Sequence, residues 1–437
     1  QLVVERGGRR ERYGHGTAGF SGGTAEEGTL RGEAVFCGYG IAARELGYDD
    51  FAGVDVRGRI VLVFDHEPQE DDPKSRFNGT GATRHSASRV KALEAQRRGA
   101  LALLVAAEPN RKHPSNAERR ARIAGGEQRA RRIASQQIEG DALRIPVLTV
   151  SDALAQDLLA GEGKKLQAAI DREGALASKT LGAAVEIRLL NRERRRGSTA
   201  NVLAVLEGSD AALRSETIVF SAHHDHDGRA DGGVFAGADD NGSGTVGVVE
   251  LARAFARDPV RPRRSVLFAV FGAEERGLLG SYYYVDHPLR AVESTRAAIN
   301  FDMIGRNETA SRQTDGLIEI DADTSNELNL IGTIHSPDYR DVVETVNRDI
   351  GLTLNYKWDR DTVLNIFQRS DQFPFALRDV PAVWWFTGFH PDYHQTSDTA
   401  EKINYAKMEK IVRLAYRAGR AMADAKAAPR FVAAPVR

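Results

Sequence analysis

The chain places histidine and acidic residues in short segments that directly follow apolar runs. The first of these segments, A-H-H-D-H, contains His223 and Asp225. The second, G-A-D-D-N-G-S-G, contains Asp239 and Asp240 and leads into a helical pattern. Imidazole nitrogens and carboxylate oxygens are the donors that zinc, and after it manganese or cobalt, take from proteins. Metal-ion chemistry is therefore the first hypothesis.

Three more segments repeat this arrangement farther along the chain. They contribute acidic, phenolic and imidazole groups: Glu274, Glu275, Asp302, Tyr393 and His394. Carboxylates beyond apolar strands are costly to desolvate unless a positive charge compensates them. Their number exceeds what one closed zinc site needs, which favours two metal ions that share a bridging carboxylate.

The spacing of apolar residues predicts the elements that position these side chains. Apolar runs typical of buried strands lie at 185–190, 200–208, 216–222, 265–272, 297–305 and 381–388. Helical patterns alternate with them, at 243–257, 338–350 and 405–422. This alternation predicts an α/β fold in which helices flank a mixed, mostly parallel sheet. Sites in such sheets lie beyond the carboxyl ends of the strands, where the histidines and acids stand.

Composition and charge argue against other classes of function. The chain has 60 Lys and Arg against 61 Asp and Glu, a formal charge of −1, so no nucleic-acid partner is expected. The apolar runs are far shorter than the roughly 20 residues of a membrane-spanning helix, so no membrane span is expected. The one cysteine, Cys37, rules out an internal disulfide and is expected to be buried filler in an apolar run.

The five motifs, in this order, resemble those of the M28 family of co-catalytic zinc peptidases: A-H-H-D-H, G-A-D-D-N-G-S-G, A-E-E-R-G-L-L-G-S, N-F-D-M-I-G-R and D-Y-H-Q-T-S-D-T. Residues 29–182, with strand-like and helical segments of their own, resemble an inserted protease-associated (PA) domain of β-rich α/β type. The resemblance then implies a peptidase domain at 183–428, followed by a tail at 429–437. Residues 1–28 would be an incomplete part of the peptidase domain.

The resemblance implies two zinc ions per chain and five ligands: His223, Asp239, Glu275, Asp302 and His394. His223 and Asp302 would hold one ion. Glu275 and His394 would hold the other, and Asp239 would bridge both. Asp240 would follow an unusual cis peptide that holds the bridge in place. Three other histidines are expected to be surface or supporting groups and are left out of the ligand set: His224, His226 and His390.

Three residues receive catalytic roles from the same resemblance. Glu274 would be the general base that takes a proton from water. Asp225 would accept the imidazole N–H of His223 and fix its tautomer. Tyr393 would donate a hydrogen bond to the developing oxyanion. No substrate-binding residue is assigned.

These roles imply an exopeptidase that cleaves peptides. The acidic surplus around the metals would attract an α-ammonium group, so an aminopeptidase is expected. Three alternatives stay open: a carboxypeptidase or dipeptidase on the same centre, a glutaminyl cyclase-like enzyme, and a non-catalytic receptor-like homologue. The first residue is Gln1, as expected of a processed or trimmed form, and the family resemblance implies a secreted or periplasmic protein. A homodimer is among the assemblies considered.

Overall fold

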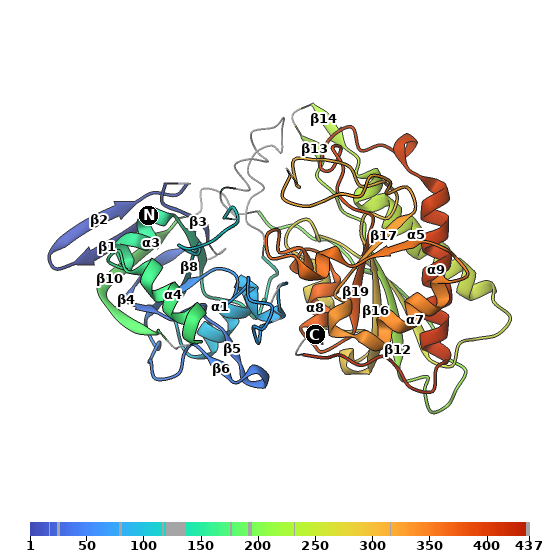
Figure 1. The fold of residues 1–437 in the computed structure, drawn as a ribbon, viewed down its shortest axis with the longest axis horizontal. Coiled ribbons are helices and arrows are strands. Elements are labelled where there is room, and N and C mark those ends of the chain that lie inside the picture. Colours follow the sequence, from blue (N-terminus) through green and yellow to red (C-terminus); the bar gives the residue numbers. More distant parts are fainter. Residues whose placement is uncertain are drawn as a thin grey trace. The chain divides into compact units, whose positions relative to one another are not determined.

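The computed structural model describes residues 1–16, 18–23, 27–77, 81–115, 118, 137–174, 177–190, 195–230, 232–314 and 316–433. The chain forms two compact units (Figure 1), whose boundary lies between Gly197 and Ser198. Part of the Arg-rich stretch at 109–140 lies outside the described residues. Within the described ranges, no helix is both long and apolar enough to cross a bilayer.

The first unit is built on an eight-stranded sheet with the strand order β2-β1-β10-β4-β7-β8-β9-β3. The strands are β1 (Leu2–Arg6), β2 (Arg9–Tyr13), β3 (Phe20–Gly23), β4 (Gly28–Phe36), β7 (Ile60–Phe64), β8 (Ala102–Ala106), β9 (Val147–Val150) and β10 (Lys179–Leu189). A separate small hairpin joins β5 (Ala42–Ala43) to β6 (Tyr48–Asp49). The pairs β4–β7, β7–β8 and β8–β9 are parallel, and the other pairs in the large sheet are antiparallel.

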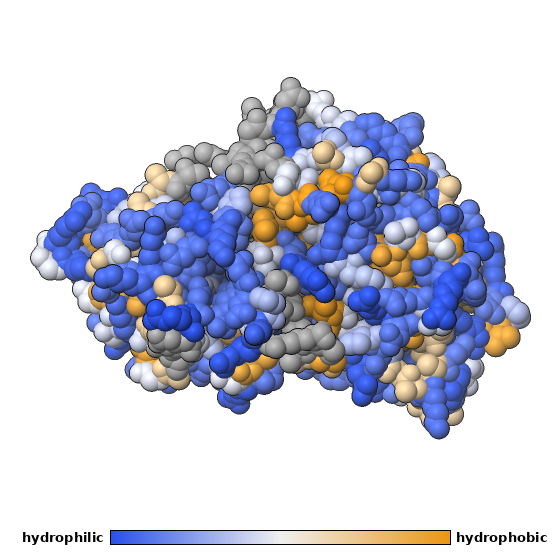
Figure 2. Space-filling view, in the orientation of Figure 1, coloured by the Kyte–Doolittle hydropathy of each residue, from blue (hydrophilic) through white to orange (hydrophobic). Residues whose placement is uncertain are grey.

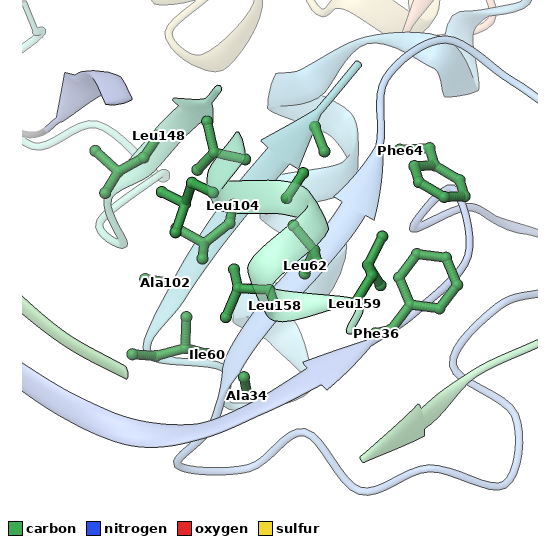
Figure 3. Close-up of a cluster of buried hydrophobic side chains, with 14 of the residues drawn as sticks. Ala34, Phe36, Ile60, Leu62, Phe64, Ala102, Leu104, Leu148, Leu158 and Leu159 are labelled. Atoms are coloured by element: carbon green, nitrogen blue, oxygen red, sulfur yellow. The ribbon is translucent and has the colours of Figure 1, made fainter. Parts of the chain in front are cut away.

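Helices cover both faces of this sheet. Successive residues of its central strands point to opposite sides, so each central strand contributes side chains to two cores. Ile60, Leu62 and Phe64 face a core closed by α3 (Asp152–Leu158) and α4 (Gly163–Glu173), part of which Figure 3 shows. Val61 and Val63 face the opposite core, which is closed by α1 (Ser88–Arg97). The continuous apolar run I-V-L-V-F follows from burial on both sides.

Residues 1–28 were expected to belong to the second unit, and the structure corrects this. Strand β1 pairs with β10, from Leu2↔Ile187 to Glu5↔Ala184, and β3 pairs with β9. Strand β10 also runs through the expected boundary at 182/183. The reason is long-range pairing: β1 finds its partner almost the whole length of the unit away, which no local pattern reveals.

The second unit holds a seven-stranded sheet with the strand order β11-β15-β12-β16-β19-β17-β18. The strands are β11 (Val202–Leu206), β12 (Thr217–His223), β15 (Ser265–Phe271), β16 (Thr295–Phe301), β17 (Glu327–Ile331), β18 (Thr353–Asn355) and β19 (Ala382–Phe386). Only β11–β15 and β17–β19 pair antiparallel. The predicted mixed, mostly parallel sheet is thus confirmed. A hairpin of β13 (Gly228–Ala230) and β14 (Gly233–Phe235) stands apart from it.

Helices cover both faces of this sheet as well. On one face lie α5 (Gly244–Arg257), α7 (Pro337–Asn347) and α9 (Tyr405–Asp424), drawn in red in Figure 1. On the other lie α6 (Leu279–Asp286) and α8 (Gln372–Ala376). The expected tail at 429–437 is described as far as residue 433, and the N–H of Val432 donates to the carbonyl of His335.

Hydrophilic residues cover most of the face in Figure 2, with apolar groups between them. Large exposed apolar side chains include Val260 and Leu289. Exposed apolar residues of this kind are normal for folded proteins.

Gly419 on α9 lies against the ring of Phe220 on β12, so closely that a Cβ at this position would overlap it. Gly419→Ala should therefore destabilise the protein by about 1–3 kcal/mol through overpacking, although alanine is the better helix former by about 1 kcal/mol. Urea unfolding measures the change. The control Ala421→Gly, at an exposed site of the same helix, should cost only the propensity difference. A more stable Gly419→Ala protein would contradict the close packing.

Candidate metal centre

The candidate site lies where the parallel strands of the second unit end. His223 ends β12 and pairs in register with Phe271, the last residue of β15. Strands β16 and β19 are parallel to them and extend the same edge. The loops that follow these strands therefore start side by side, and they carry Glu274, Asp302 and His394 to one place.

One group of side chains surrounds His223. Its Nε2 atom lies 3.5 Å from Asp302 Oδ1 and 3.8 Å from Glu274 Oε2. All three side chains are buried, and each offers a donor atom within 4.8 Å of the others'. This arrangement joins three of the residues that the sequence singled out.

A second group surrounds His394. Its Nε2 atom lies 3.3 Å from Glu275 Oε1, and His226 Nδ1 lies 2.8 Å from the same oxygen. These three residues also offer donor atoms within 4.8 Å of one another. His226 was left out of the expected ligand set, yet the structure places its ring 5.0 Å from that of His394.

Asp240 connects the two groups. Its Oδ1 lies 3.3 Å from His223 Nε2, and its Oδ2 lies 3.0 Å from His394 Nε2. The carboxylate is buried and spans the gap between the two imidazoles. This is the geometry of a bridging ligand, with one oxygen directed to each side.

The structure places neither Asp239 nor the cis peptide as the family resemblance implies. Asp239 Oδ1 accepts a hydrogen bond from the N–H of Gly305 at 2.7 Å, and Oδ2 lies 3.2 Å from His390 Nε2. The cis bond joins Asp240 to Asn241, one residue later than the expected bond between Asp239 and Asp240. Two adjacent aspartates of equal chemistry give the sequence no means to choose between them. The backbone of the turn decides which one faces the centre.

The carboxylate of Asp225 has a different partner from the one expected. His223 Nδ1 lies 3.1 Å from the backbone carbonyl of Asp225 and 3.7 Å from its carboxylate, so the carbonyl accepts the imidazole N–H. The carboxylate instead accepts hydrogen bonds from the N–H groups of Glu274 at 2.9 Å and Glu275 at 3.2 Å. Asp225 thereby fixes the segment that carries both glutamates.

Three supporting residues were not identified from the sequence. His394 Nδ1 lies 3.1 Å from Asp227 Oδ2, and Ser370 Oγ donates to Asp302 Oδ2 at 2.5 Å. Asp398 accepts the N–H groups of both aspartates in the glycine-rich turn, at 3.0 and 3.2 Å. Two of them had a visible signal: Asp398 lies within the motif D-Y-H-Q-T-S-D-T, and Asp227 continues the alternation of acids along the segment that begins at His223.

The side chain of Tyr393 packs against that of His394, beside the candidate centre. Its ring centroid lies 4.0 Å from that of His394 and 5.2 Å from that of Phe389. The guanidinium of Arg369 lies over the Phe389 ring, and its Nη2 is 3.5 Å from the Tyr393 hydroxyl.

Burial and mutual repulsion shape the titration of these groups. Burial raises the pKa of Glu274 well above its usual range, and the nearby carboxylates of Asp302 and Glu275 raise it further against the opposing effect of His223. Burial alone would lower the pKa of His223, but the carboxylates of Glu274 and Asp302 raise it well above the usual value. The site thus favours positive charge between its carboxylates.

The donor set fits divalent zinc. His223 Nε2 and His394 Nε2 are buried and have no hydrogen-bond partner, although both face carboxylates. Ligand bonds of about 2.0 Å in a tetrahedral zinc site place neighbouring donor atoms about 3.3 Å apart, close to the separations here. Nitrogen and oxygen donors without a thiolate suit zinc, and the described Cys37 is buried in the first unit.

Several of the curated and solved proteins that are similar to this chain are aminopeptidases. Over 228 residues the chain is 30% identical to leucine aminopeptidase 2 from Arthroderma otae, a match that covers 47% of this chain and 41% of that protein. Over 71 residues it is 49% identical to aminopeptidase YwaD from Bacillus subtilis, covering 16% of this chain and 15% of the other. A solved aminopeptidase from Aneurinibacillus sp. strain AM-1 aligns with 100% of this chain and 83% of its own, at 18% identity and a TM-score of 0.43.

The chain spans less than half the length of the leucine aminopeptidase that it matches. The family match covers the whole candidate centre, because residues 201–418 match the family model described as peptidase family M28. All five motifs and the strands that position them lie inside this range. This segment of the chain belongs to peptidase family M28.

Proposed function

We propose that the second unit is a zinc exopeptidase that binds two zinc ions and acts at the amino termini of peptides. The observation that carries this proposal is the position of Asp240, with one carboxylate oxygen near each of two buried imidazole Nε2 atoms that have no hydrogen-bond partner. We assign His223 and Asp302 to one ion. Glu275 and His394 are assigned to the other.

The proposed chemistry is hydrolysis of a peptide bond. A zinc pair supplies Lewis acidity toward the scissile carbonyl and lowers the pKa of the attacking water. Glu274 is the proposed general base, because it lies beside His223 and its backbone N–H is held by Asp225. A buried carboxylate with a raised pKa is suited to take a proton from water and return it to the leaving amine. The Tyr393 hydroxyl is the proposed donor to the developing oxyanion.

The charge balance supports action at amino termini. Four carboxylates at the centre offset the charge of two divalent ions. They belong to Asp240, Glu274, Glu275 and Asp302. Asp225 adds a further negative charge, whereas Asp392 is neutralised by Arg306 at 2.9 Å and Lys402 at 2.7 Å. The pocket therefore carries no positive excess for an α-carboxylate and is suited to an α-ammonium group. The aminopeptidase names of the similar proteins support the same choice.

A carboxypeptidase is the second candidate, and one observation favours it. Arg369 reaches the hydroxyl of Tyr393, so its guanidinium lies close to the centre. Arginine can bind a terminal carboxylate through two parallel hydrogen bonds. This arginine already lies over the ring of Phe389, and a single guanidinium does not outweigh the acidic surroundings.

One peptide in three forms tests the choice between these activities: free, N-acetylated and C-amidated. The free and amidated forms should be cleaved from the amino terminus at similar kcat/KM, and the acetylated form should resist cleavage because it lacks the α-ammonium group. Mass spectrometry of the products measures the outcome. Cleavage of the acetylated form with the amidated form spared would replace the proposal with a carboxypeptidase.

Two statements about the whole protein stay predictions from the family resemblance. They are that residues 29–182 form an inserted PA domain, and that the protein is secreted or periplasmic. The parallel strands β4, β7, β8 and β9 with helices on both faces are compatible with the first of these.

A further inference from the structure

A separate group of histidine and glutamate side chains lies in the first unit, outside the family match. It consists of His66, Glu70, Glu108 and His113, each of which offers a donor atom within 4.8 Å of the others'. We propose that these four residues form a further zinc site. The proposal concerns the first unit alone and does not depend on the peptidase activity of the second.

As in the candidate metal centre of the second unit, residues that follow the ends of parallel strands come together here. Strands β7 and β8 are parallel, and their last residues, Phe64 and Ala106, pair in register. The N–H of Asp65 extends the pairing by donating to the carbonyl of Ala106 at 2.8 Å. His66 and Glu108 follow these strand ends and are therefore neighbours at the carboxyl edge of the sheet.

The distances between the donor atoms are those of a compact cation site. His66 Nδ1 lies 3.0 Å from Glu70 Oε2 and 3.8 Å from Glu108 Oε1. His113 Nε2 lies 2.7 Å from Glu70 Oε1. Donor atoms about 3.3 Å apart are expected around a tetrahedral zinc ion, so small side-chain rotations would complete the site.

A second observation that points to a cation is the burial of the Glu108 carboxylate. Its side chain is 3% exposed, and its Oε1, the oxygen directed toward His66, has no hydrogen-bond partner. The nearby ammonium of Lys91 donates to the carbonyls of Phe64 at 2.9 Å and His66 at 2.5 Å. A buried carboxylate oxygen without a partner is costly, and a cation between the two side chains would compensate it.

The two imidazole rings favour a metal ion over a pair of protonated histidines. They stack with their centroids 4.4 Å apart and their planes 11° from parallel. Two imidazolium rings in this arrangement would repel each other, whereas neutral rings that share one cation would not. The carbonyl of Pro114 lies 3.1 Å from His113 Nδ1 and accepts a hydrogen bond from its N–H, which leaves Nε2 as the ligand atom.

The donor set selects zinc among the common divalent ions. Two neutral imidazoles and two carboxylates give a four-coordinate site in which the charges of zinc and its ligands cancel. Calcium and magnesium prefer six or more oxygen ligands, which these four side chains do not provide. His66 and Glu108 are almost fully buried, so an ion bound here would be shielded from solvent on that side.

Zinc content of the purified full-length chain tests the proposal. His113→Gln and Glu108→Gln should each lose one equivalent of zinc per chain relative to the unaltered protein after dialysis, measured by elemental analysis. Glu67→Gln is the matched control, because Glu67 is a buried glutamate of the same loop that accepts hydrogen bonds from Thr83 and lies outside the group. The control should keep the full zinc content. Unchanged zinc content in both test variants would overturn the proposal.

A second measurement needs no variant and so does not depend on whether the variants fold. Crystals of the unaltered chain, grown with zinc, should give an anomalous difference peak at the zinc edge between His66 Nδ1, His113 Nε2 and Glu108. Absence of this peak would overturn the proposal. The peptidase centre is a separate position in the same map, so either site can be present without the other.

Discussion

Replacing Glu274 with glutamine should reduce kcat by a factor of about 10²–10⁴, the usual contribution of a general base, with the zinc content unchanged. Glutamine keeps the size of the side chain and removes the carboxylate that accepts the proton. The N–H of residue 274 should still donate to Asp225, so the local backbone should not change. Steady-state kinetics and elemental analysis of the same preparation measure the two effects.

The neighbouring glutamate provides the control for this prediction. Glu275→Gln alters the same segment, but Glu275 lies 3.3 Å from His394 Nε2 and is assigned to a zinc ion. This variant should lose zinc as well as activity. If Glu274→Gln retained more than about a tenth of the original kcat, Glu274 would not be the general base.

The sequence predicted which residues come together at the candidate site, but not the contacts that each of them makes there. The apolar runs before His223 and Asp302 mark buried strands, and parallel strands end at one edge of a sheet. These two facts are enough to bring the residues together without knowledge of any loop. Which atom faces which neighbour depends on backbone turns. For that reason the sequence predicts neither that Asp240 lies between the two imidazoles nor which groups the carboxylate of Asp225 contacts.

Long-range pairing limited the prediction of the fold. Strand β1 is a short segment in a Gly- and Arg-rich region, and its partner β10 lies at the other end of the first unit. Strand β17 was also missed, because E-L-N-L-I carries polar residues that are buried in the sheet. The proposed zinc site in the first unit was also not evident from the sequence, for a related reason. His66 and His113 belong to no local motif, and only the parallel pairing of β7 and β8 makes their loops neighbours.

Asp240→Asn should remove both of the proposed zinc ions, because this one carboxylate lies between the two imidazoles at 3.3 and 3.0 Å. Zinc content should fall by two equivalents per chain. The loss in kcat/KM should exceed the roughly 10–100-fold that replacing a group behind a metal ligand costs.

Asp239→Asn is the matched control, since asparagine can still accept the N–H of Gly305 and Asp239 lies outside the proposed ligand set. This control should keep both ions and lose activity only within that lower range. If Asp239→Asn lost zinc and Asp240→Asn retained it, Asp239 would be the bridging residue. If Asp240→Asn lost a single equivalent, its carboxylate would bind one ion and not two.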